Sequence, residues 1–126
     1  MRKFLVALLS IATLAIALPV ASADTPVIRI VDKPHLNFDG TWRNNELVTL
    51  LEPNGRLGKL VFSPASGNRT WVIDAELVDE ALAMSAGYKF GKEDQALGKL
   101  IATNWLNRLR IATRGDQVIA LPYGNA

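Results

Sequence analysis

Three short extended segments recur along the chain at similar spacing, and they limit the folds that it can adopt. They are Val-Ile-Arg-Ile-Val-Asp at residues 27–32, Thr-Trp-Val-Ile-Asp at 70–74 and Val-Ile-Ala-Leu-Pro-Tyr at 118–123. Sequence with helical periodicity fills most of the space between them. Strands that alternate with helices are typical of parallel β/α units. We therefore expect an α/β fold with three mainly parallel strands and flanking helices.

Apolar spacing and capping residues predict four helices between these strands. Asn44 or Asn45 can cap a short helix, and a second short helix begins at Arg56. Asp74 is a preferred N-cap residue and directly precedes a third helix. The longest predicted helix covers residues 93–113. Its apolar stripe consists of Leu97, Ile101, Trp105 and Leu109.

Residues 1–23 have the composition of a secretory signal peptide. Arg2 and Lys3 form a basic start, residues 4–18 form an apolar run, and Ala-Ser-Ala at 21–23 is a small-residue cleavage site. The apolar run is short for a membrane-spanning helix, which needs about 20 residues. We expect a secreted or extracytoplasmic protein of the cell envelope; an uncleaved signal anchor is the alternative.

The remaining residues, 24–126, are expected to form a single α/β domain. Removing 23 of the 126 residues leaves 103, enough for one small domain, whereas a closed β/α barrel takes about 200 or more. The chain has no Cys, so its core must hold it together without disulfides. Three parallel strands have two open edges. Further chain, a partner that covers the edges, or a compact variant of the fold would resolve this.

The charge balance argues against a nucleic-acid partner. The leader contains two of the 14 basic residues and none of the 12 acidic ones, so residues 24–126 carry 12 of each. Nucleic-acid binding calls for a clustered basic face. Arg108, Arg110 and Arg114 do cluster, but cations near a helix C-terminus are favoured by the helix dipole.

Polar residues that follow the first two strands are candidates for a catalytic site. In parallel sheets, ligands bind at the carboxyl ends of the strands. Asp32 and Asp74 end the first two strands, His35 is close to Asp32, and Glu76 follows Asp74 as a substrate-binding candidate. Paired carboxylates across a sugar-sized gap can hydrolyse glycosidic bonds. An Asp and a His with one more ligand could instead hold a divalent metal.

Each of these residues also has a structural interpretation. Asp74 can cap the helix that follows it, and Asp32 can hydrogen-bond the turn at Pro34. His35 can pack against Trp42 or bond to nearby backbone. The sequence leaves both interpretations open.

Tyr123 and Asn125 are candidates for substrate binding at the end of the third strand. An aromatic ring and an amide suit sugar stacking and hydrogen bonding, and they also suit an ordinary turn. The sequence contains no Gly-rich phosphate loop, no nucleophile elbow and no His-x-x-x-His spacing. We therefore predict no cofactor and no metal.

Several motifs together resemble a known family. They are Asp-Lys-Pro-His at 32–35, Gly-Arg-Leu at 55–57, Thr-Trp-Val-Ile-Asp at 70–74, Trp-Leu-Asn-Arg-Leu at 105–109 and Leu-Pro-Tyr at 121–123. In this order they resemble the N-terminal region of large secreted actinobacterial envelope proteins of unknown function. The first domain of that family is similar to glycoside-hydrolase and polysaccharide-deacetylase-like β/α barrels.

The resemblance implies that the chain corresponds to the first units of an incomplete β/α barrel. The family usually has acidic residues after the Leu-Pro-Tyr motif, and here Asn125 occupies such a position. We therefore expect a cell-envelope-associated protein with a partial carbohydrate-active-like domain that is not catalytic alone. A glycan hydrolase or deacetylase and a non-catalytic interaction module are the alternatives. The expected partners are cell-wall glycan or another envelope protein, with membrane contact only through an uncleaved leader.

Overall fold

The computed structural model describes residues 25–91 and 93–122, which form most of the predicted domain. The predicted signal peptide, Tyr123 and Asn125 lie outside these residues, so the predictions made for them stay predictions. Within the described ranges, no helix is both long enough and apolar enough to cross a membrane.

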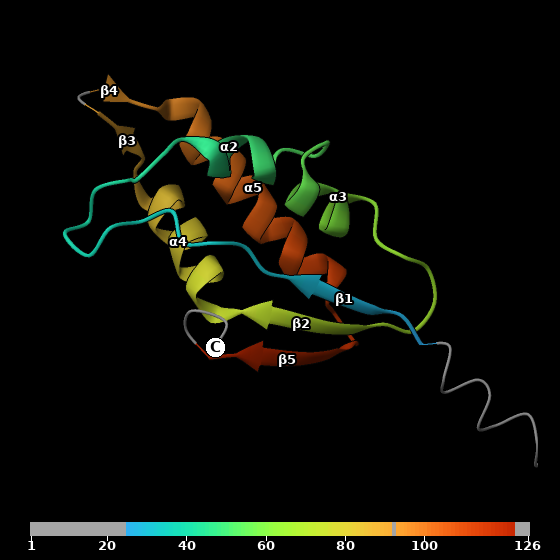
Figure 1. Ribbon diagram of the computed structural model, residues 1–126. Helices are drawn as coiled ribbons and strands as arrows, with labels where there is room; N and C mark the ends of the chain where they lie inside the picture. The colour runs from blue at the N-terminus through green and yellow to red at the C-terminus, as the bar shows by residue number, and fades with distance from the viewer. Residues whose placement is uncertain (1–24, 92, 123–126) are drawn as a thin grey trace, which may run out of the picture.

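The sheet consists of three parallel strands in the order β1-β2-β5 (Figure 1). Strand β1 spans Val27–Ile30, β2 spans Thr70–Asp74 and β5 spans Gln117–Leu121. Strand β1 pairs with β2 so that Ile30 lies beside Ile73. The predicted α/β class with three parallel strands is therefore confirmed, whereas the incomplete barrel stays a prediction.

Four helices connect the strands of the sheet and lie together on one side of it (Figure 1). Helices α2 (Glu46–Leu51) and α3 (Arg56–Phe62) lead from β1 to β2. Helices α4 (Ala75–Ala86) and α5 (Ala96–Ala112) lead from β2 to β5. Because side chains alternate along a strand, only one side of the sheet faces this helical layer. The residues of β1 and β2 that are buried against it are Ile28, Ile30, Trp71 and Ile73.

The start of the longest helix differs from its prediction. Helix α5 begins at Ala96, whereas the sequence predicted a helix from residue 93. The preceding residues form a small antiparallel hairpin of β3 (Lys89–Phe90) and β4 (Glu93–Asp94). Gly91 has a φ of 69°, a left-handed conformation that favours glycine and lets the chain reverse direction. The turn therefore overrides helical propensity at these positions.

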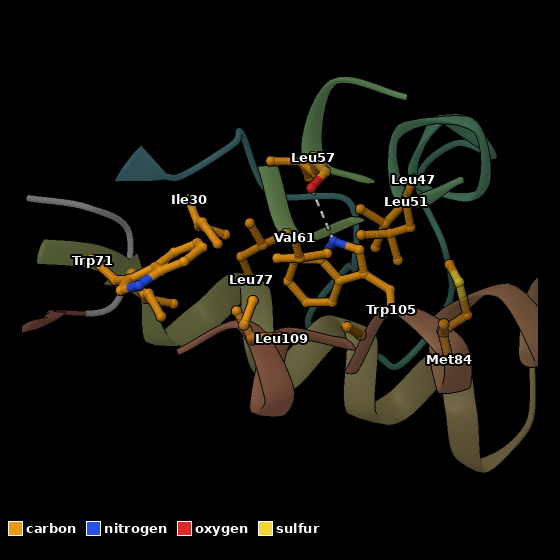
Figure 2. Close-up of a cluster of buried hydrophobic side chains, with 14 of the residues drawn as sticks. Ile30, Leu47, Leu51, Leu57, Val61, Trp71, Leu77, Met84, Trp105 and Leu109 are labelled. Carbon is orange, nitrogen blue, oxygen red and sulfur yellow. Dashed lines mark hydrogen bonds between the residues drawn. The ribbon is translucent and has the colours of Figure 1, made fainter. Parts of the chain in front are cut away.

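Trp105 lies at the centre of the core, where α5 meets the two short helices (Figure 2). Its side chain is fully buried, and its indole N–H donates to the backbone carbonyl of Leu57 at 3.0 Å. A buried indole usually finds such a partner, because an unpaired N–H is costly away from water. The surrounding apolar side chains in Figure 2 include Leu47, Leu51, Val61, Leu77 and Met84. One indole therefore joins α2, α3, α4 and α5 into a single core.

We expect Trp105→Ala to destabilise the protein strongly, because it leaves a cavity among rigid neighbours. Truncations of this kind cost about 3–5 kcal/mol. Leu97→Ala is the matched control, since Leu97 is on the same helix and 64% exposed; it should change the free energy of unfolding by less than about 0.5 kcal/mol. Urea denaturation followed by circular dichroism measures both. Equal losses in the two variants would contradict the central place of Trp105.

Candidate functional site

Asp32 and Asp74 lie at the same end of the sheet. Asp74 is the last residue of β2, and Asp32 follows the end of β1 by two residues. The last residue pair of the two strands is Ile30 beside Ile73, so both strands end at the same edge of the sheet. The structure thus brings the two predicted carboxylates to neighbouring strand ends, where parallel sheets commonly bind ligands.

His35 is held inside a polar cluster with both ring nitrogens bonded. The side chain is 0% exposed, Nε2 contacts the carboxylate of Asp32, and Nδ1 lies 2.8 Å from Oδ1 of Asn44. The same Asn44 oxygen accepts the backbone N–H of Glu46 at 3.0 Å, so it faces His35 as an acceptor. Each ring nitrogen of His35 therefore faces a side-chain oxygen of the protein.

Arg56 completes the surroundings of Asp32. Its guanidinium contacts Oδ1 of Asp32, and the same nitrogen donates to the carbonyl of Val31 at 3.3 Å. One carboxylate oxygen of Asp32 therefore meets His35 and the other meets Arg56. This arrangement ties the first turn of α3 to the segment that leaves β1.

Glu80 fastens the same segment to α4. Its Oε2 accepts the backbone N–H of His35 at 2.8 Å and that of Leu36 at 2.9 Å, and the side chain is buried. Burial raises the pKa of Glu80 and outweighs the opposing effects of the two N–H donors and of His35; nearby Glu76 adds to the rise. A buried carboxylate that accepts two backbone bonds is a structural clamp.

Asp74 caps helix α4 and leaves one oxygen unpaired. Its Oδ1 accepts the backbone N–H of Glu76 at 3.0 Å, which confirms the capping interpretation. The side chain is fully buried, and its Oδ2 has no hydrogen-bond partner among the residues that the structure describes. Such an atom in a native structure calls for an explanation, and a role in chemistry is one.

Glu76 lies beside Glu80 in the wall of a shallow pocket. The pocket has a volume of about 280 Å³ and is also lined by Asp79, Glu80 and the segment 36–38. Glu76 is half-buried, and its side chain forms no hydrogen bond or ion pair with His35 or Asp32. Of the other substrate-binding candidates, Tyr123 and Asn125 lie outside the described residues. The structure thus places Asp32 and His35 in contact, whereas no hydrogen bond or ion pair of the described residues joins the side chains of Asp74 or Glu76 to that pair.

Three residues of the cluster were missed as site residues by the sequence analysis. Asn44 and Arg56 were interpreted only as the beginnings of helices. Glu80 carries a signal that could have found it, because it lies three residues after Leu77 and four before Met84. A charged residue on the apolar stripe of a helix is almost always paired when buried.

The cluster as a whole is arranged to hold backbone segments together. Across residues 25–91 and 93–122, no three His, Asp or Glu side chains come together in a way that could hold a metal ion.

No protein-family model matches the chain, and neither a curated protein nor a solved structure matches it.

Substitution of Glu80 tests the clamp. Both backbone N–H groups donate to one carboxylate oxygen, so Glu80→Gln can keep both bonds through its single carbonyl oxygen. Glu80→Ala leaves both donors unpaired and should lose about 1–3 kcal/mol for each. Urea denaturation at neutral pH measures the two variants. Equal stability of the Gln and Ala variants would contradict the clamp.

Comparison of the unsubstituted protein with Glu80→Gln predicts how the contribution of Glu80 to stability changes with pH. A raised pKa in the folded state means that Glu80 contributes stability fully below its ordinary pKa of 4.5, and that this contribution is lost as the pH rises through the raised value. The free energy of unfolding of the unsubstituted protein should therefore fall relative to that of Glu80→Gln as the pH rises above about 4.5. Urea titrations at several pH values measure the difference. A difference that stays constant with pH would refute the titration of Glu80.

Proposed function

We propose that the chain is an extracytoplasmic, cell-envelope-associated protein that acts by binding and not by catalysis. The observation that carries the proposal is that the ring of His35, bonded to Asp32, is inaccessible to a substrate. The imidazole is 0% exposed, and both its nitrogens are bonded within the protein. A general base must come within hydrogen-bond reach of a substrate proton, and this ring presents no such atom.

The contacts of the other candidate catalytic residues support the same proposal. One oxygen of Asp32 is bound by His35 and the other by Arg56, and Asp74 is buried as a helix cap. These bonds hold the segment after β1 against α3 and α4. The polar residues at this end of the sheet then serve to fix the shape of a binding module.

The proposed location and partner class come from the sequence. The predicted signal peptide and the resemblance to secreted envelope proteins support an extracytoplasmic place, and cell-wall glycan or another envelope protein is the corresponding partner class. Large apolar side chains are exposed on β5, including Val118 and Ile119, which favours a protein partner.

A glycan hydrolase or deacetylase is the second candidate, and one observation favours it. Among the described residues, no partner binds the buried Oδ2 of Asp74, which lies at the sheet end where β/α proteins bind ligands. An unpaired carboxylate oxygen is a suitable acceptor for a substrate hydroxyl or amide. Activity through Asp74 would require the residues that bury it to move, so that a substrate can reach its Oδ2.

Incubation with purified cell-wall glycan separates the two candidates. We expect neither reducing ends nor acetate to be released above the blank, because the ring of His35 is fully buried and bonded and Asp74 is buried as a helix cap. Asp74→Asn is the matched variant, since Asn also caps helices well and keeps α4 in place. Release by the unsubstituted protein that Asp74→Asn abolishes would overturn the binding-only proposal and support the second candidate.

A further inference from the structure

The outer edge of β5 is unpaired within the part of the chain that the structure describes. The sheet order β1-β2-β5 leaves this strand with one neighbour, and Figure 1 shows no described element beyond it. Its five residues, Gln117–Leu121, include no charged residue and no proline. Monomeric proteins usually protect such an edge with charge, proline or a bulge. The other edge strand, β1, has that protection, because Arg29 lies in its middle.

Both faces of β5 are apolar and exposed. On the helix side, Val118 is 49% exposed and lines a groove of about 470 Å³ between β5, α4 and α5. On the opposite side, Ile119 is 44% exposed and lies beside Val72 of β2. The strand therefore offers free backbone groups together with apolar side chains in both directions.

We propose that the partner of this edge is a second copy of the chain, paired through β5 in antiparallel orientation. The inference rests on the proposed binding function and names its partner. A two-fold axis through Ile119 pairs all five residues of β5 and joins two three-stranded sheets into one of six strands. Such an interface uses the same patch on both copies, as closed dimers do.

The register of the sheet makes this pairing complementary to itself. With the axis at Ile119, Val118 of one copy lies opposite Ala120 of the other. Val118 continues the row of Trp71, and Ala120 continues the row of Ile73, so two core rows join across the interface. On the other side, Ile119 meets its own counterpart, and Val72 flanks it in each copy. Cross-strand apolar pairs of this kind stabilise sheets.

The charges that line the groove also fit a two-fold axis. Asp79 lies in the second turn of α4, whose N-terminus is at the carboxyl end of the sheet. Arg110 lies in the last turn of α5, near the start of β5. An antiparallel dimer reverses one groove against the other, so it directs Asp79 of one copy toward Arg110 of its counterpart. Opposite charges placed in this way select orientation.

The proposal is tested by sedimentation and cross-linking of the chain without its predicted signal peptide, residues 24–126. Sedimentation analysis should show a concentration-dependent dimer that Ile119→Arg abolishes, because it places two cations opposite each other at the axis. Val27→Arg is the matched control, since Val27 is 61% exposed on the other edge strand, and this variant should keep the dimer. The chain has no Cys, so Ile119→Cys introduces a single thiol. A short bis-maleimide should join two copies of Ile119→Cys and should not join two copies of Val27→Cys.

The outcomes separate this inference from the function on which it rests. A chain that stays monomeric at all concentrations, or one whose Val27→Cys variant cross-links as readily, overturns the self-pairing through β5. Either result leaves the binding-only proposal standing if cell-wall glycan is not turned over. Glycan turnover that Asp74→Asn abolishes overturns that proposal instead, whatever the oligomeric state.

Discussion

The helices cover one side of the three-stranded sheet, and the other features of the protein depend on this arrangement. Both crossovers, from β1 to β2 and from β2 to β5, place their helices in the same layer (Figure 1). Burial is therefore concentrated on the side that faces Trp105, while Ile119 and Val27 stay exposed. The core that results is a single one, held between the sheet and α2 to α5. The edges and the opposite side of the sheet remain as surfaces for association.

The polar cluster bonds the backbone of the segment that follows β1. The chain must leave β1 at the carboxyl end of the sheet and turn back into the helical layer, and the turning segment has backbone groups to satisfy. Glu80 accepts two of its N–H groups, and Asp32 binds both His35 and Arg56 across the turn. Residues typical of a catalytic rim are thus used as connectors between β1, α3 and α4.

The fold could be predicted from the sequence further than the site could. Strand segments with helices between them predicted the parallel sheet, and Asp74 predicted the start of α4, because both signals are local. The hairpin before α5 was missed, since pairing of two-residue strands is decided by a turn at Gly91 and by contacts, not by a long pattern. The closeness of His35 to Asp32 was predicted because only three positions separate them, but the bond of His35 to Asn44 spans nine positions and those of Glu80 span 44 and 45. Periodicity carries no information on such pairings.

The resemblance to barrel-like domains and the proposed dimer make different demands on one edge. A further β/α unit would add a strand parallel to β5 and would lay its helix over the groove beside Val118. A second copy would instead add an antiparallel strand and would fill the groove from both ends with Asp79 and Arg110. Both solutions bury the same apolar residues and satisfy the same backbone groups, so one molecule cannot use both. Pairing of β5 with a further β/α unit and pairing of β5 with a second copy therefore exclude each other.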